Sequence, residues 1–325
     1  MLIDILKTHG SSNDILVIEG RPSQFENPSV HEFVAALCDR KGPFGGDGVY
    51  FVDDTVSPPE AFFFNSDGSA GKFCGNGLRT VARWVLDRKE AEEIAIRIGD
   101  FSFQVENRPE SKNGVRQTRL TLPPISFRVA DLPMTWPEDT CIAQRIPQLH
   151  DELTFTALAV PNPHLVAITS SYSRDELVRL GERMVRSTGL LPDGANVSLV
   201  QPIGPDEFFG ATFERGAGLT LSCGSGVVAS RAAYSRLGYC NPQDAVTIHN
   251  PGGDAISTID VSTGQWIPTL SGNASYVYRT AVDPATFVAA PGSYGIETYA
   301  DEITAFTNDL SINEARLAEV GIRLQ

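Results

Sequence analysis

Two cysteines in nearly identical glycine-rich phrases are the residues best suited to chemistry in this chain. Cys74 lies in Phe-Cys-Gly-Asn-Gly, and Cys223, 149 residues later, lies in Ser-Cys-Gly-Ser-Gly. An apolar run with helical spacing follows each phrase, so each sulfur should lie at a helix N-terminus. The unpaired N–H groups of a helix N-terminus favour a thiolate and bind a carboxylate. We therefore expect one thiolate and one thiol to act as base and acid on opposite faces of a small amino acid.

The 149-residue offset recurs elsewhere, which indicates an internal duplication. Residues of the same or similar type share it: Asn13 with Asn162, Pro43 with Pro192, Asp47 with Asn196, and Phe64 with Phe213. Apolar spacing predicts helices at 28–39, 78–86, 174–186 and about 226–236, with strand-like text between them. The sequence thus predicts two similar α/β domains, an N-terminal copy over 1–126 and a C-terminal copy over 127–270.

The segment from 289 to 325 has no counterpart in the first copy. A capping-box pattern, Ser-Ile-Asn-Glu, begins at Ser311 and precedes an apolar helical pattern. We expect this C-terminal extension to form two short helices without a role in the chemistry.

Composition and charge exclude several function classes. The chain has 325 residues, of which 42% are hydrophobic and 20% are charged, as in an ordinary globular protein of two domains. Its net charge of -14 argues against binding to nucleic acid or to an anionic membrane. No apolar run is long enough to span a bilayer, and the first residues lack the pattern of a signal peptide. We expect a cytoplasmic protein.

The remaining cysteines and the histidines suggest neither disulfides nor a metal. The chain has five cysteines, an odd number, and no Cys-x-x-Cys, so a disulfide framework is not expected. The five histidines are scattered without ligand spacing, so no metal site is expected either. Outside the two glycine-rich phrases, a free cysteine is usually a small core residue, which is our expectation for Cys38, Cys141 and Cys240.

At these residues the chain resembles the diaminopimelate epimerase family, whose members interconvert LL- and meso-diaminopimelate without a cofactor. The resemblance covers about residues 1–285. The matching phrases stand in the family's order: His9-Gly-Ser-Ser-Asn-Asp-Ile, Asn65-Ser-Asp-Gly-Ser, Cys74-Gly-Asn-Gly-Leu-Arg, Asn162-Pro-His-Leu-Val, Asn196-Val, Glu214-Arg-Gly-Ala-Gly and Cys223-Gly-Ser-Gly.

The resemblance implies a role for each matching residue. Cys74 and Cys223 match the two catalytic positions. Backbone N–H groups hold the reacting carboxylate at positions matching Gly75, Asn76, Gly224 and Ser225. His164 and Glu214 match residues that tune the two sulfurs. Further substrate contacts, several at the non-reacting end, match Asn13, Asn65, Asn162, Asn196, Glu214 and Arg215.

The resemblance also implies a fold and an assembly. Each copy should be a curved, mostly antiparallel sheet wrapped around a central helix that begins at its cysteine, with a substrate site between the copies. A strand within 271–288 should return to the first domain. The family implies a homodimer and no cofactor.

Two departures from the family's pattern concern substrate identity. Gly48 stands where the family often has a substrate-contacting Gln, and Leu219 stands where it has Glu. A related racemase or isomerase acting on another amino acid or small acid is therefore a second hypothesis. A third is a non-catalytic amino-acid-binding protein, although the presence of both cysteines argues against it. A purely structural role remains the alternative for His164 and Glu214. For the Asn residues, the alternative is that they form turns.

Overall fold

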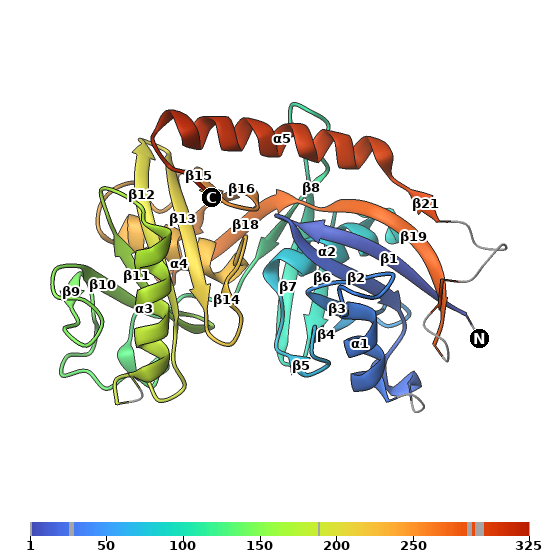
Figure 1. Cartoon of the computed structure of the whole chain (residues 1–325), viewed down its shortest axis with the longest axis horizontal. Helices are drawn as coiled ribbons and strands as arrows, with labels where there is room; N and C mark the ends of the chain where they lie inside the picture. Colours follow the sequence, from blue (N-terminus) through green and yellow to red (C-terminus); the bar gives the residue numbers. More distant parts are fainter. Residues whose placement is uncertain (1, 26–28, 188, 285–287, 290–295, 325) are drawn as a thin grey trace. The chain divides into compact units, whose positions relative to one another are not determined.

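The computed structural model describes residues 2–25, 29–187, 189–284, 288–289 and 296–324. The chain divides into two compact units, which are described separately (Figure 1). Unit 1 comprises Met1–Leu120 and Ser271–Asp309, and unit 2 comprises Thr121–Leu270 and Leu310–Gln325. Parts of the predicted return strand and C-terminal extension, 285–287 and 290–295, lie outside the described residues. Within the described part of the chain, no helix is long and apolar enough to cross a membrane.

Unit 1 is a mixed sheet with two α-helices from its N-terminal segment. Its elements from that segment are β1 (Ile3–Gly10), β2 (Asn13–Glu19), η1 (Pro22–Gln24), α1 (Val30–Cys38), β3 (Gly48–Asp53), β4 (Glu60–Asn65), β5 (Ala70–Gly71), α2 (Gly75–Lys89), β6 (Glu93–Ile98), β7 (Phe101–Arg108) and β8 (Gln117–Thr121). The later segment adds β19 (Ser275–Asp283), β20 (Val288–Ala289) and β21 (Glu297–Thr298). Strand β19 pairs antiparallel with β1 along most of its length.

Unit 2 repeats this order of elements. They are η2 (Val129–Asp131), β9 (Gln144–Arg145), β10 (Thr154–Val160), β11 (Asn162–Ile168), α3 (Arg174–Arg186), β12 (Asn196–Gly204), β13 (Glu207–Glu214), β14 (Gly218–Leu219), α4 (Gly224–Arg236), β15 (Val246–Asn250), β16 (Gly253–Ser257) and β17 (Ile259–Asp260). Strand β18 (Ile267–Asn273) contains the boundary between the units.

Strand pairing confirms the predicted duplication. In unit 1, β2 pairs parallel with β3 and β4 pairs parallel with β6, whereas β1–β2, β3–β4 and β6–β7 are antiparallel. In unit 2 the equivalent strands pair identically: β11–β12 and β13–β15 are parallel, and β10–β11, β12–β13 and β15–β16 are antiparallel. The fold class is therefore the predicted one, an α/β fold built from two copies of one curved-sheet unit.

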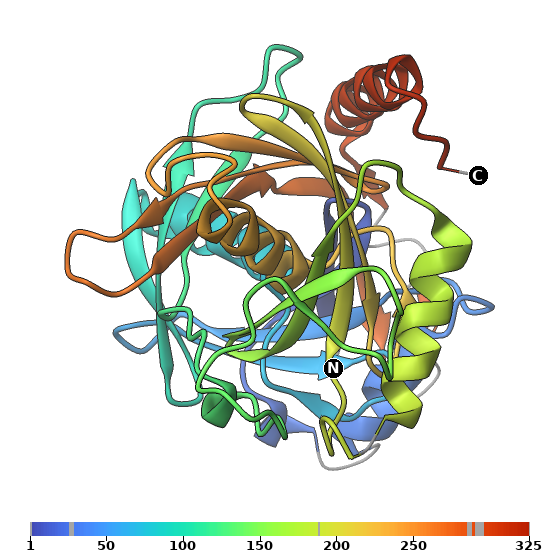
Figure 2. The same ribbon diagram turned by 90° about the vertical axis from the view of Figure 1, so that its left-hand side faces the viewer.

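Each unit encloses one helix and carries another on its outer face. Helix α2 packs on β1, β2, β3, β6 and β7, and α4 packs on the corresponding strands of unit 2. Figure 2 shows α4, in gold, with strands of its unit on several sides. Because they are surrounded, both helices are buried over nearly their whole length. Helices α1 and α3 bury only one apolar stripe, which in α3 contains Leu177, Leu180 and Met184.

Over the described residues 296–324, the C-terminal extension forms one helix, α5 (Ala300–Glu319), and not the two short helices that were expected. Ser311 lies inside this helix, so its capping-box pattern does not begin a new one. In unit 1, Glu302 accepts hydrogen bonds from both terminal nitrogens of Arg83, at 2.6 and 2.8 Å. In unit 2, Leu317 and Ile322 join the apolar core. These contacts give the extension a structural role in each unit.

The same helix contributes to a charged cluster around His249 in unit 2. The imidazole lies 3.0 Å from Glu207, 2.8 Å from Asp254 and 2.9 Å from the side-chain oxygen of Asn313 on α5. Burial alone would lower the pKa of His249, but the hydrogen bonds and charges of these neighbours outweigh it and raise the pKa to about 9. Protonated His249 therefore stabilises unit 2.

This cluster predicts a pH dependence of stability. Because the folded-state pKa exceeds the unfolded value, the contribution is complete below about pH 6.5 and is lost as pH rises through about 9. We expect the loss of about 2 kcal/mol of unfolding free energy, a value discounted for solvent screening. Urea unfolding across that range measures it. His249→Gln should flatten the dependence, and an unchanged slope in that variant would contradict the assignment.

Candidate active site

Cys74 caps the N-terminus of α2, as its sequence context predicted. Its sulfur accepts a hydrogen bond from the N–H of Gly77 at 3.5 Å, and its S–H donates one to Oδ1 of Asn13 on β2 at 3.1 Å. The side chain is partly exposed. Gly77 has no room for a side chain because a Cβ there would lie 2.8 Å from Ile15 and 2.9 Å from Tyr50. The glycine therefore lets the first turn of α2 lie directly on the sheet.

Tyr50 holds the cysteine loop in place, although the sequence analysis did not identify it. Its hydroxyl accepts a hydrogen bond from the N–H of Cys74 at 2.8 Å and donates one to the Cys74 carbonyl at 3.1 Å. Burial, and then the charge of the Cys74 sulfur, raise the pKa of Tyr50 well above its usual value. The duplication gave no indication of this residue, since Leu199 occupies the matched position.

A tight turn between β1 and β2 positions Asn13. Ser11 and Ser12 both have positive φ, 51° and 59°, as the two-residue turns of β-hairpins require. The Asn13 amide donates to Asp47 at 3.0 Å, and Asp47 in turn pairs with Arg40 at 2.6 Å. These bonds fix the amide so that its oxygen faces the Cys74 sulfur.

The other predicted residues of unit 1 are placed differently. Gly75 and Asn76 are the first residues of α2, where backbone N–H groups have no partner within the helix. Gly10 of β1 lies against the Asn76 carbonyl, which a Cβ at Gly10 would approach to 2.3 Å. Asn65 is exposed at the end of β4, and its amide donates to Ser69 at 2.9 Å. The Asn65 side chain therefore stabilises the turn that follows β4.

A phenylalanine ring occupies the space beside Gly48, where the family often has Gln. A Cβ on Gly48 would lie 2.6 Å from the ring of Phe63, and one on Gly71 would lie 2.5 Å from it. The ring also packs against Tyr50, with centroids 4.9 Å apart. Gly48 is thus matched to Phe63, and a Gln side chain would not fit without displacing that ring.

Cys223 caps the N-terminus of α4 in the same way that Cys74 caps α2. Its sulfur accepts a hydrogen bond from the N–H of Gly226 at 3.3 Å and lies 3.5 Å from the Ser225 hydroxyl. Burial, and then the negative charge of Glu214, hold the pKa of the Cys223 thiol well above its usual range. Burial and the neighbouring carboxylate of Glu214 therefore both favour the protonated form of Cys223.

The two residues predicted to tune the sulfurs lie around Cys223. Glu214 ends β13, hydrogen-bonds the Cys223 thiol and accepts from the Thr220 hydroxyl at 2.6 Å. His164 is fully buried, and its Nε2 lies 3.1 Å from the hydroxyl of Ser225. Burial, and then the charge of Arg215, lower the pKa of His164 to about 3, which keeps the ring neutral.

The remaining predicted residues of unit 2 lie along the ends of neighbouring strands. The amide of buried Asn196 lies 3.9 Å from the Cys223 sulfur and accepts from the N–H of Arg215 at 3.0 Å. The exposed guanidinium of Arg215 donates to the carbonyls of Asp193 and Gly194, at 2.8 and 3.3 Å. Asn162 begins β11, as Asn13 begins β2.

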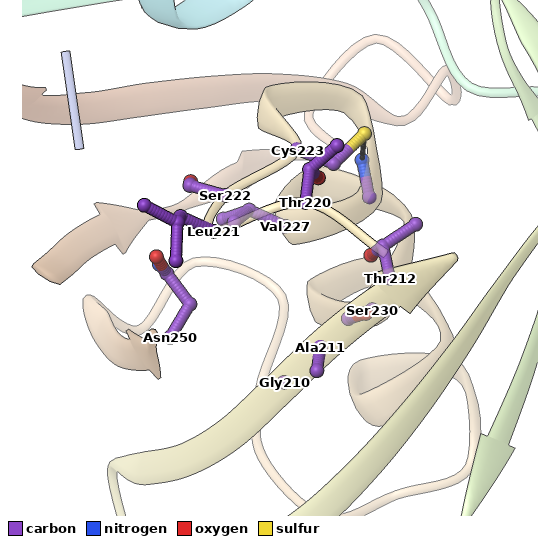
Figure 3. Close-up of a pocket in the computed structure, with 11 residues that line it drawn as sticks. Gly210, Ala211, Thr212, Thr220, Leu221, Ser222, Cys223, Val227, Ser230 and Asn250 are labelled. Carbon is purple, nitrogen blue, oxygen red and sulfur yellow. Dashed lines mark hydrogen bonds between the residues drawn. The ribbon is translucent and has the colours of Figure 1, made fainter. Parts of the chain in front are cut away.

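A cavity of about 10 Å³, the space of one water molecule, lies beside the Cys223 loop (Figure 3). Its lining includes the polar side chains of Thr212, Thr220, Ser222, Ser230 and Asn250. A larger cavity of about 200 Å³ in unit 1 is lined by Trp84, Arg88, Tyr276 and neighbours, none of them a predicted site residue. Among the described residues, no three His, Cys, Asp or Glu side chains gather as metal ligands do.

Each unit thus holds a cysteine sulfur at a helix N-terminus with a side-chain amide beside it. The amide belongs to Asn13 in unit 1 and to Asn196 in unit 2. Such a site can bind a carboxylate through backbone N–H groups and exchange a proton through the sulfur. The three other cysteines differ because none of them caps a helix N-terminus: Cys38 is the last residue of α1, Cys141 lies between η2 and β9, and Cys240 follows α4 and contacts Arg231.

Solved structures share this fold at low sequence identity. A phenazine biosynthesis protein of the PhzF family from Bacillus anthracis has a TM-score of 0.61 and 13% identity, over 87% of this chain and 99% of that one. A predicted epimerase from Pseudomonas aeruginosa has a TM-score of 0.61 and 13% identity, over 90% and 100% of the two chains. A hydroxyproline epimerase from Agrobacterium vitis has a TM-score of 0.57 and 16% identity, over 87% and 92%. These similarities establish the fold alone.

Sequence comparison identifies the family. A curated diaminopimelate epimerase from Clostridium acetobutylicum is 32% identical over 286 residues, which cover 86% of each chain. Another from Lactiplantibacillus plantarum is 33% identical, over 85% of this chain and 88% of that one. A third, from Listeria welshimeri, is 29% identical over 98% of this chain and 96% of that one. This match therefore includes the C-terminal helix. The sequence model of the family described as diaminopimelate epimerase matches residues 5–115 and 156–277. This chain therefore belongs to the diaminopimelate epimerase family of isomerases.

Proposed function

We propose that the protein interconverts LL- and meso-diaminopimelate by a two-thiol proton transfer without a cofactor, in the synthesis of lysine and peptidoglycan precursors. The single observation that carries the proposal is the equivalence of Cys74 and Cys223. Each caps the central helix of its unit, and each has an Asn side chain beside its sulfur. The substrate is the one for which the similar epimerases from Clostridium acetobutylicum and Lactiplantibacillus plantarum are named.

In the proposed reaction the two sulfurs serve opposite faces of the α-carbon. The thiolate of one cysteine removes the α-proton, and the thiol of the other gives its proton to the opposite face, so the centre inverts. Each sulfur ends in the protonation state in which the other began. The reverse reaction exchanges the two roles.

The backbone supplies the stabilisation that this step needs. Negative charge spreads onto the substrate carboxylate as the α-proton leaves. N–H groups at Gly75, Asn76, Gly224 and Ser225 stand at the two helix N-termini, where they would bind that carboxylate. The neighbouring side chains Asn13 and Asn196 fix the orientation of the sulfurs.

Charged and amide side chains are proposed to bind the distal, non-reacting end of the substrate. Diaminopimelate carries a second carboxylate and ammonium, which need a cationic fork and several acceptors. We assign this end to Asn65, Asn162, Glu214 and Arg215, while His164 and Glu214 tune Cys223. In keeping with the family resemblance, we further propose that the enzyme is a cytoplasmic homodimer.

Proton exchange with solvent tests this function directly. Freshly reduced protein in heavy water, with no pyridoxal phosphate added, should place deuterium at the α-carbon of LL- or meso-diaminopimelate. The matched control is the same protein alkylated with iodoacetamide, which should give no label. Absence of label with the reduced enzyme would reject the proposal.

A second candidate function is racemisation of another amino acid on the same scaffold. The observation that favours it is the filled space at Gly48, where Phe63 leaves no room for the Gln that often contacts substrate in the family. The same deuterium experiment, run with lysine, glutamate and proline, separates the two. Label in one of these acids but not in diaminopimelate would support the second candidate.

A further inference from the structure

The side-chain amide of Asn13 presents its oxygen to Cys74, and its two partners fix this orientation. Its Nδ2 donates to Oδ2 of Asp47 at 3.0 Å, while its Oδ1 accepts the S–H of Cys74 at 3.1 Å. A carboxylate only accepts hydrogen bonds, so the nitrogen of the amide must face Asp47 and the oxygen must face the sulfur. Because the amide oxygen has no proton to donate, it can bond the sulfur only while the sulfur keeps its own proton.

Asp47 is held in place by both its side chain and its backbone. Its Oδ2 also accepts from the backbone N–H of Asp14 at 2.8 Å, and its Oδ1 accepts from the guanidinium of Arg40 at 2.6 Å. The N–H of Asp47 in turn donates to the Asp14 carbonyl at 2.8 Å. The position of this carboxylate beside Asn13 is therefore set by the backbone that joins the start of β2 to the chain before β3.

The amide beside the sulfur of unit 2 presents its opposite end. Asn196 occupies the position that corresponds to Asp47 at the 149-residue offset. Its Oδ1 accepts from the backbone N–H of Arg215 at 3.0 Å, so its Nδ2 donates toward Cys223, at 3.9 Å. Unit 1 therefore offers its cysteine an acceptor at the place where unit 2 offers a donor.

The other titratable groups around the Cys74 loop leave this contact as the direct one. They are Lys7 and His9 on β1, Asp14 on β2, Tyr50 on β3, Arg79 on α2 and the exposed Lys72 before the cysteine. Burial keeps Tyr50 and His9 neutral, since it raises the pKa of Tyr50 well above its usual value and lowers that of His9 to about 4. Lys7 and Asp14 form an ion pair at 3.1 Å. The charge of Arg79 favours a thiolate, but its guanidinium bonds neutral groups in the core, whereas the amide oxygen touches the sulfur.

We propose that Asp47 is a positioning residue that, through the amide of Asn13, holds Cys74 as a thiol in the free protein, so that Cys74 enters the reaction as the acid. The thiol state is argued from the hydrogen bonds alone, and only the assignment as acid rests on the proposed function, which it deepens. The role of Asp47 is to fix which end of the amide meets the sulfur.

The proton transfer that follows balances as one bond broken and one formed. The S–H bond of Cys74 breaks and leaves its electron pair on the sulfur, while the electron pair of the α-carbon takes the proton and forms a C–H bond. The N–H of Gly77, at 3.5 Å, remains as a donor to the new thiolate. Cys223 is then the thiol that must lose its proton before this turnover, and the N–H groups of Gly226 and Asn196 face its sulfur to bind the thiolate.

Alkylation of the free protein tests the inference, because the thiolate is the form that reacts. Iodoacetamide rates at Cys74, followed by peptide mass spectrometry across a pH series, give the midpoint of its ionisation. A thiol activated at a helix N-terminus ionises between about pH 3.5 and about pH 7.5. The Cys74 midpoint of the unmodified protein should lie above that range, and a midpoint within it would overturn the inference.

A double-mutant cycle tests whether Asp47 acts through the amide. Asp47→Asn lets the Asn13 amide turn its nitrogen to the sulfur, so alkylation of Cys74 below its midpoint should become about two- to tenfold faster. Asn13→Ala removes the acceptor and should accelerate the reaction by a similar factor. In the Asn13→Ala background, adding Asp47→Asn should change the rate by less than about 1.5-fold. An equal acceleration by Asp47→Asn in both backgrounds would overturn the inference.

Asp14→Asn is the matched control for charge. It removes a carboxylate of the same ion-pair cluster but keeps the bond between the side chains of Asn13 and Asp47. The Cys74 rate should stay within about twofold of the original, since the amide keeps its orientation. An acceleration as large as that of Asp47→Asn would show a general effect of charge and would overturn the inference. If Asp47→Asn does not fold, Asn13→Ala decides, because an unchanged Cys74 rate in that variant would also overturn it.

The outcome is separable from that of the proposed function, because alkylation needs neither substrate nor turnover. A Cys74 thiol that Asp47→Asn activates, in a protein that labels no amino acid in heavy water, would uphold the positioning role and reject the epimerase. Deuterium labelling of diaminopimelate together with a low Cys74 midpoint would uphold the epimerase and reject the positioning role.

Discussion

Single replacement of Cys74 or Cys223 by alanine should abolish epimerisation, with kcat reduced by at least about 10³-fold. Each thiol is assigned one proton transfer, and general acid or base catalysis contributes about 10²–10⁴-fold. The alanine side chain leaves the helix N-terminus and its N–H groups in place, so substrate binding should largely survive. Chiral chromatography of the diaminopimelate stereoisomers measures the loss.

The matched control for this prediction is Cys240→Ala. Cys240 is partly exposed, as Cys74 is, but it contacts Arg231 on the far turns of α4. Its removal should change kcat by less than about threefold, because it is assigned no proton transfer. If Cys74→Ala or Cys223→Ala kept more than about a tenth of the original kcat, the two-thiol mechanism would be wrong.

Loss of one carboxylate on the C-terminal helix, that of Glu302, should clearly destabilise unit 1. Glu302 binds both terminal nitrogens of Arg83 and also accepts from the backbone N–H of Tyr276 at 3.0 Å. Glu302→Ala would leave the buried Arg83 guanidinium with only the longer contact to Asp87 at 3.4 Å and the face of Tyr276 at 3.7 Å. Breaking one partner of a buried pair costs about 3 kcal/mol.

Denaturant unfolding of paired variants checks this value. Asp309→Ala, on the same helix, removes only an exposed bond to Asn113 and should cost less than about 0.5 kcal/mol. The double variant Arg83→Met with Glu302→Ala should recover part of the loss, because no buried charge remains. Equal midpoints for Glu302→Ala and Asp309→Ala would show that the C-terminal helix does not stabilise unit 1 through this pair.

Local pattern was enough to predict much of the secondary structure and the positions of the cysteine loops. Apolar spacing predicted a helix at 174–186, and α3 has these bounds. The glycine after each cysteine and the apolar run that follows predicted the caps of α2 and α4, because capping depends on residues within one turn. The capping-box pattern at Ser311 was misleading, since burial of Leu317 and the bonds of Asn313 keep α5 continuous there.

The sequence by itself determined the duplication, the fold class, the family and the two cysteine loops, because each of these depends on residue types at fixed spacing. Only the tertiary structure decided which groups surround each sulfur. Tyr50 and Asn13 come from separate strands, and no spacing in the chain relates Tyr50 to Cys74. Burial then sets the charges, because a side chain such as His164 or Cys223 titrates according to the solvent it has lost and the neighbours it has gained. Two copies of one pattern thereby acquire two different electrostatic environments.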